Sequence, residues 1–79
     1  MVHKEMHRWL CEYVLHKHMN DDRNEMVTEL RISERMLDRA LKREDSPEAR
    51  LVFELCLRYC IDRDIDINEV FRRYFYDEE

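Results

Sequence analysis

The sequence has 79 residues and a formal net charge of -5, and charged and hydrophobic residues make up 42% and 44% of it. This length allows one domain, and the share of apolar residues argues against a disordered tail. No apolar run approaches the roughly 20 residues of a membrane span, and the N-terminus has no apolar core suited to a signal peptide. We therefore expect residues 1–79 to form a single cytoplasmic domain.

The sequence contains no glycine and one proline, so few residues interrupt helices. Apolar residues recur at helical spacing in five segments. This pattern predicts an all-α fold, a compact bundle of five helices. The expected helices cover about 3–19, 23–31 and 33–43, a fourth segment from Pro47 and a fifth from Asp66.

The first two expected helices are separated by polar residues at 20–22. The first helix has an apolar face that includes Trp9, Leu10 and Val14. Asp22 is placed to cap the second helix, and Glu25 stands three residues later, as in a capping box. Met26 and Leu30 then form the inner face of the second helix.

Capping residues also mark the starts of the later helices. Ser33 is a good N-cap for the third helix, and Ser46 followed by Pro47 is typical of a helix start. Asp66, with Glu69 three residues on, opens the fifth helix. The inner face of the third helix should consist of Met36, Leu37, Ala40 and Leu41. The fourth should bury one stripe made of Leu51, Val52, Leu55, Cys56, Tyr59 and Cys60.

The charge of the chain is unevenly distributed. Residues 31–43 carry five basic and two acidic side chains, between two acidic stretches. Arginines recur there every four residues, so they lie near one face of the third helix. Like charges at this spacing repel by a few tenths of a kcal/mol per pair, so stability gives no reason for such a stripe. It consists of Arg31, Arg35, Arg39 and Arg43.

A nucleic acid would give a reason, because arginine bonds guanine bidentately and neutralises phosphates. Glu34 and Asp38 then have two alternative roles. They accept hydrogen bonds from the amino group of cytosine, or they form ion pairs with nearby Arg and Lys side chains. The simpler interpretation is a solvated helix face, in which Asp38 and Lys42 form an ordinary i, i+4 ion pair.

Two helices joined by a tight turn over residues 22–43 have the arrangement of a helix-turn-helix. The segment from Asp22 to Ser33 resembles helix 2 and the turn of the lambda-repressor-like, Xre/Cro-type DNA-binding domains. Leu37 matches the buried aliphatic position of their recognition helix. Downstream, Ser46-Pro47 falls near the proline that precedes their helix 4, and the segment from 65 to 71 resembles their helix 5.

The resemblance implies sequence-specific binding of double-stranded DNA by a small transcriptional regulator, with the helix of residues 33–43 in the major groove. It places Glu34, Arg35 and Arg39 on base-reading positions, and Arg23 where relatives commonly have a glutamine near a phosphate. The DNA-binding residues expected on this basis are Arg23, Ser33, Glu34, Arg35, Asp38, Arg39, Lys42 and Arg43.

The sequence departs from the family at Arg31, which stands where a turn glycine is usual. We expect Arg31 to adopt a left-handed conformation at a cost of roughly 1 kcal/mol. The alternative function is a degenerate helix-turn-helix that serves as a protein-interaction module. The two functions differ in charge: DNA binding requires an unpaired basic stripe, whereas a module that binds protein leaves it neutralised by acids such as Glu34 and Asp38.

A metal-responsive helical protein is a third hypothesis. His3, His7 and Cys11 recur every four residues, and Cys56 and Cys60 add two more potential ligands. This spacing is unspecific, and helix periodicity places Cys56 and Cys60 on an apolar stripe, so we expect them to be buried, reduced thiols. No cofactor is implied, and without a glycine-rich loop we expect no enzyme.

The C-terminal segment is rich in aromatic residues, which predicts an apolar patch on the fifth helix. Phe71 and Phe75 should enter the core, whereas Tyr74 and Tyr76 should extend the patch outward. Exposed patches of this kind often mark contacts between protein molecules. We therefore expect a homodimer through the fifth helix.

Overall fold

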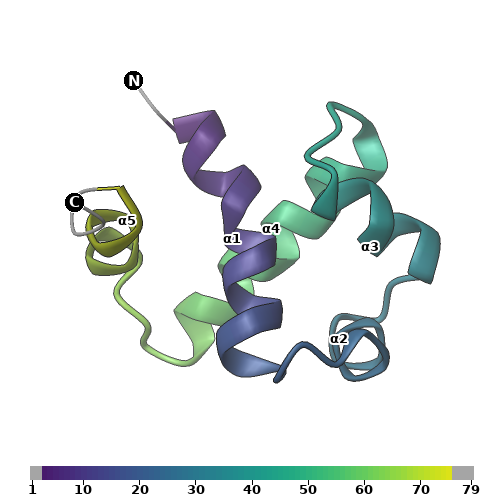
Figure 1. Cartoon of the computed structure of the whole chain (residues 1–79), viewed down its shortest axis with the longest axis horizontal. Helices are drawn as coiled ribbons and strands as arrows, with labels where there is room; N and C mark the ends of the chain where they lie inside the picture. The colour runs from purple at the N-terminus through teal and green to yellow at the C-terminus, as the bar shows by residue number, and fades with distance from the viewer. Residues whose placement is uncertain (1–2, 76–79) are drawn as a thin grey trace.

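The computed structural model describes the backbone of residues 3–75 and the side chains of residues 9–70 and 72. Within this part of the chain all regular structure is α-helical, and the five helices form a compact globule, as the sequence predicts (Figure 1). The helices are α1 (His3–His18), α2 (Arg23–Leu30), α3 (Glu34–Leu41), α4 (Pro47–Asp62) and α5 (Ile67–Phe75).

Four of the helix starts are fixed by the side chains that the sequence marks as caps, and at the start of α5 this is Asp66, which accepts a hydrogen bond from the backbone N–H of Glu69 at 3.4 Å. Asp22 accepts a hydrogen bond from the backbone N–H of Glu25 at 3.2 Å, and Ser33 accepts from that of Met36 at 3.1 Å. Ser46 accepts from the N–H of Ala49 at 3.2 Å, with Pro47 in the first turn of α4. Each cap satisfies a backbone donor that has no partner within its helix.

The helix ends are less usual, because the chain has no glycine for the left-handed conformation that commonly ends a helix. Positive φ angles are instead adopted by Asn20, Asp21, Arg31, Arg43 and Asp64, at 53° to 61°. Asparagine and aspartate tolerate this region better than arginine. Sequence reasoning expected a left-handed residue at 31, and this prediction is confirmed.

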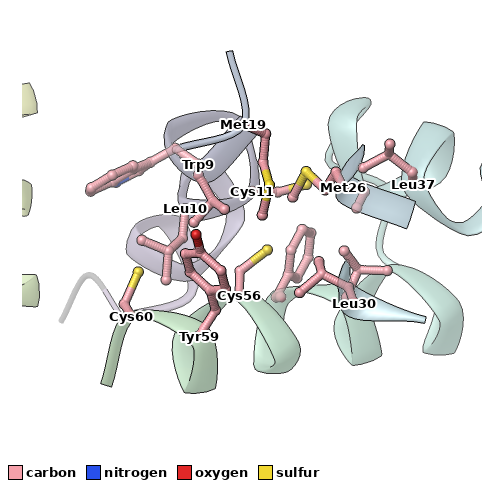
Figure 2. Close-up of a cluster of buried hydrophobic side chains, with 14 of the residues drawn as sticks. Trp9, Leu10, Cys11, Met19, Met26, Leu30, Leu37, Cys56, Tyr59 and Cys60 are labelled. Carbon is pink, nitrogen blue, oxygen red and sulfur yellow. The ribbon is translucent and has the colours of Figure 1, made fainter. Parts of the chain in front are cut away.

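The core lies between α1, α3 and α4, which make the most extensive contacts with one another. Figure 2 shows how side chains from α1 and α4 face each other, with α2 and α3 closing one end of the cluster. Leu10, Cys11 and Val14 of α1 are fully buried, as are Val52 and Cys56 of α4. The predicted burial of Trp9, Leu10 and Val14 is therefore confirmed, with Cys11 as an addition, whereas Lys17, which shares the predicted helical pattern, is exposed.

The stripe predicted for α4 is wrong at Leu51, which is 47% exposed. The buried residues of α4 are Ala49, Val52, Phe53, Cys56, Tyr59 and Cys60. They cluster about one direction of a 3.6-residue helix, and Leu51 lies on the opposite side. Periodicity alone also fits a wider stripe that includes Leu51, and only the position of α1 and α3 decides between the two.

α2 and α3 are separate helices, joined by Arg31, Ile32 and Ser33. Figure 1 shows α2 nearly along its axis, whereas α3 runs across the view, so the two helices are steeply inclined. Met26 of α2 and Leu37 of α3 are fully buried against the core. The side chains of Phe71 and Phe75, which the sequence predicts to enter the core, lie outside the described part of the structure, but Val70 of α5 joins the core.

Candidate functional site

The start of α3 is held by the three residues that precede it. The backbone N–H groups of Arg31 and Ile32 both reach the carbonyl oxygen of Val27, the second at 3.1 Å. This arrangement closes α2 with Arg31 in the left-handed conformation, at φ 59° and ψ 51°. Ile32 is half-buried and packs against the core, so the segment between α2 and α3 is held by a side-chain contact as well as by these hydrogen bonds.

One side of α3 is buried and the other faces solvent. Leu37 and Ala40 are completely buried, and Met36 and Leu41 are half-buried. Glu34 and Arg35 are exposed at the start of the helix, and Asp38 and Arg39 are half-buried one turn later. Lys42 and Arg43 follow the helix and are exposed.

The structure therefore places seven of the eight predicted site residues on α3 or directly before or after it, and Arg23 at the beginning of α2. Ser33 is a special case, because its hydroxyl is engaged as the N-cap of α3. The outward placement of Arg35 is as predicted. The placement of Arg39 is less open than predicted, since its side chain is half-buried.

The carboxylates of α3 form a connected set of ion pairs with two cations. Arg23, at the start of α2, lies between Glu34 and Asp38, with its Nη2 3.5 Å from Oε1 of Glu34 and 3.7 Å from Oδ1 of Asp38. The other oxygen of Asp38 lies 3.2 Å from Nζ of Lys42, the i, i+4 pair expected from the sequence. We call Arg23, Glu34, Asp38 and Lys42 the α2–α3 ion network.

Two further arginines of the predicted stripe are also paired. Nη1 of Arg39 donates a hydrogen bond to Oε1 of Glu44 at 3.0 Å. Nη2 of Arg43 donates to Oε1 of Glu12, on α1, at 2.9 Å. The stripe is thus not uniformly unpaired. Of its four arginines, Arg31 and Arg35 are exposed and form no ion pair within the described part of the chain.

Sequence reasoning missed Glu12 and Glu44 as partners of the basic stripe. Glu44 lies five residues after Arg39 and reaches it only because the chain reverses at the left-handed Arg43. Glu12 lies 31 residues from Arg43 in sequence. No local pattern signals that second pair, which depends on how α1 packs beside α3.

The cysteines are all inside the protein. Cys11, Cys56 and Cys60 are free thiols with no exposed surface, as predicted for the last two. A hydrogen bond with Cys11, followed by burial, raises the pKa of the Cys56 thiol, and burial raises the pKa of Cys60 to about 11. Both effects favour the neutral thiol over the thiolate that binds metals.

Nothing in the described residues resembles a metal site. No group of three or more His, Cys, Asp and Glu among them is arranged to hold an ion. The side chains of His3 and His7 lie outside this part of the structure. Cys11, the third member of the predicted ligand set, is buried on the inner side of α1 and contacts Cys56, not solvent.

Near the C-terminal end of α1, aromatic rings form a row of contacts that the sequence does not predict. The ring of His18 meets those of Tyr13 and Tyr59 edge-on, at centroid distances of 5.4 and 5.8 Å. The guanidinium of Arg63 lies 3.8 Å above the Tyr59 ring and 3.7 Å from a carboxylate oxygen of Glu29 on α2. These contacts connect the ends of α1 and α4 with α2.

The tyrosines predicted to mediate dimerisation, Tyr74 and Tyr76, lie outside the described side chains.

Comparison of the chain with protein-family models, with curated proteins and with solved structures finds no match. Among the described residues no helix is both long enough and apolar enough to cross a membrane.

Proposed function

We propose that this protein binds double-stranded DNA as a small cytoplasmic transcriptional regulator, with α2 and α3 acting as a helix-turn-helix. One observation carries the proposal. Arg35 is exposed and has no ion pair in the described part of the chain, on a short helix that Leu37 and Ala40 anchor in the core. An arginine side chain on an anchored helix is suited to reach a base edge in the major groove.

The chemistry of base reading favours guanine at the position that Arg35 contacts. A guanidinium bonds the O6 and N7 atoms of guanine together, and such a pair contributes about 1–3 kcal/mol of discrimination. Carboxylates accept hydrogen bonds from the amino group of cytosine. Arg35 beside Glu34 and Asp38 therefore supports recognition of a site that contains G·C pairs.

The ion pairs of Arg39 and Arg43 depart from the unpaired basic stripe expected for DNA binding, but pairs of this kind can be exchanged for phosphates. Pairs between exposed side chains contribute at most about 1 kcal/mol, and Lys42 and Arg43 are about 65% and 49% exposed. A phosphate that approaches either cation replaces one anionic partner by another. We propose that Lys42 and Arg43 contact the DNA backbone in this way, together with Arg31, which has no ion pair among the described residues. The free, buried thiols suit a reducing compartment such as the cytoplasm.

A second candidate is a protein-interaction module, and the ion pairs are the observation that favours it. Arg23, Lys42, Arg39 and Arg43 all have acidic partners. A face with mixed and largely balanced charge fits a protein partner as well as it fits a nucleic acid. The net charge of -5 points in the same direction, because a protein that simply coats nucleic acid is usually basic.

The test compares two exposed arginines that differ in position. Arg35 lies on the outer side of α3, whereas Arg58 lies on the side of α4 away from the core, and neither has an ion pair in the described residues. The assay measures binding to a duplex selected by the protein, over a series of salt concentrations. Arg35→Ala should lose about 1–3 kcal/mol of binding and relax preference at one base pair, whereas Arg58→Ala should bind like the wild type.

Equal binding by both variants would contradict the role of Arg35. An even loss of affinity on all sequences, with a salt slope smaller by about one unit, would instead assign Arg35 to a phosphate. Removal of either exposed side chain should change the stability by no more than about 0.5 kcal/mol, so thermal unfolding of both variants controls for the fold.

A further inference from the structure

Two carboxylates on the outer side of α3 are unfavourable for a helix that enters a DNA groove. Glu34 and Asp38 lie on either side of Arg35 in sequence and are roughly half exposed, at 58% and 49% of their side chains. Phosphates surround a helix in the major groove, so unneutralised carboxylates there would repel the duplex. The structure must therefore offer compensation for these two charges if α3 binds DNA.

Arg23 is positioned to supply it. Its single guanidinium lies within ion-pair distance of both carboxylates, 3.5 Å from Glu34 and 3.7 Å from Asp38. Lys42 reaches only Asp38 among the ion pairs of the described residues. Arg23 is the first residue of α2, directly after the capping Asp22, whose backbone N–H is held by the carbonyl oxygen of Met19 at 2.8 Å. This bond holds the start of α2 to the preceding turn, and the shared core that includes Met26 and Leu37 holds α2 beside α3.

We propose that Arg23 is the internal counter-ion of α3: its one positive charge offsets part of the negative charge of Glu34 and Asp38, so that they face the duplex with less repulsion. This inference rests on the proposed DNA binding. In this role Arg23 is a positioning and specificity-determining residue that acts through two other side chains and needs no contact with DNA.

The distances support a counter-ion in preference to a closed hydrogen-bonded pair. At 3.5 and 3.7 Å the guanidinium is too far for short, charge-assisted hydrogen bonds, which measure about 2.7–2.9 Å. The carboxylate oxygens consequently keep lone pairs for other donors, such as the amino group of cytosine. A tight bidentate pair would use more of the roughly four acceptor sites of each carboxylate.

The competing role for Arg23 is direct contact with a phosphate. The two roles differ in how Arg23 depends on the carboxylates. A counter-ion matters only while Glu34 and Asp38 are charged, whereas a phosphate contact contributes equally when they are replaced by amides. The double-mutant cycle between Arg23 and the two acids measures this dependence directly.

The experiment uses the wild type, Arg23→Ala, Arg23→Lys, the double variant Glu34→Gln/Asp38→Asn, and the triple variant that adds Arg23→Ala. Each is titrated with the duplex that the wild type prefers, over a salt series, and thermal unfolding confirms that each is folded. We expect Arg23→Ala to weaken binding about tenfold, a coupling of the size found in side-chain ion networks. Arg23→Lys should retain most of the affinity, because it retains the charge.

In the amide background we expect Arg23→Ala to change affinity less than about twofold, since no carboxylate remains to be neutralised. Equal losses in the two backgrounds, with a salt slope lower by about one unit in both, would overturn the counter-ion role and assign Arg23 to a phosphate. If the wild type binds no duplex, the proposed function and this inference both fail, whereas equal losses with a binding wild type overturn this inference alone.

Discussion

Replacing Arg31 by glycine should stabilise the protein, although it removes a side chain and adds none. Arg31 ends α2 at φ 59° and ψ 51°, a region in which the Cβ of an L-residue lies too close to the following carbonyl oxygen. A left-handed conformation costs a residue other than glycine roughly 1–2 kcal/mol. Glycine avoids this cost, but it loses more backbone entropy on folding than other residues do. That loss reduces the gain in stability by roughly 0.5–1 kcal/mol. The expected net gain is about 0.5–1 kcal/mol.

For a domain of this size, that gain corresponds to a rise in Tm of about 2–8 °C. Circular dichroism during thermal and urea unfolding measures it. Arg58→Gly is the matched control, because Arg58 is also an exposed arginine but lies inside α4. There the same change should destabilise by about 1 kcal/mol. A loss of stability in Arg31→Gly would refute the assignment of backbone strain to residue 31.

Three further predictions concern the core, the thiols and the oligomeric state. Leu37→Ala should destabilise the protein by about 2–5 kcal/mol, as for other fully buried leucines, and denaturant unfolding measures the loss. Thiol reagents at pH 8 should label the native protein far more slowly than the unfolded one, because Cys56 and Cys60 are buried and the pKa of Cys60 is raised to about 11; equal rates would contradict their burial. Sedimentation should detect a dimer, free or on DNA, that Tyr74→Ala weakens; a monomer under both conditions would refute dimerisation.

The helix starts were readable from the sequence because capping depends on a few neighbouring residues. Asp22, Ser33 and Ser46 each bond a backbone N–H three residues ahead, and this spacing is visible without a structure. The left-handed turn at Arg31 was also predicted, because the resemblance to Xre/Cro-type domains places a turn glycine at this position, and the structure has φ 59° there.

The orientation of α4 was only partly predictable. Its apolar residues cover much of the helix surface, so the periodicity does not define one inner face. Leu51 was wrongly placed inside, and Ile61 is 60% exposed as well. The sequence does not predict the burial of Cys11, because a cysteine between Leu10 and Glu12 is compatible with either side of α1. In each case the deciding factor is the packing of a distant helix.

The electrostatics of the candidate site were the least predictable part. The pair between Asp38 and Lys42 follows from helix spacing. The contact of Arg43 with Glu12 joins α1 to the residue after α3, and the position of Arg23 between two acids joins α2 to α3. Such pairs depend on tertiary structure, and they decide how much of the basic stripe is available to a partner.

The central claim is that α3 recognises double-stranded DNA by sequence, and selection from a pool of randomised duplexes at low salt tests it most directly. The wild-type protein should enrich a site that contains G·C pairs, and Arg35→Ala should lose the preference at one position of that site. If the wild type retains no duplex above background at low salt, where electrostatic attraction to phosphates is strongest, the claim is contradicted and the protein-interaction function takes its place.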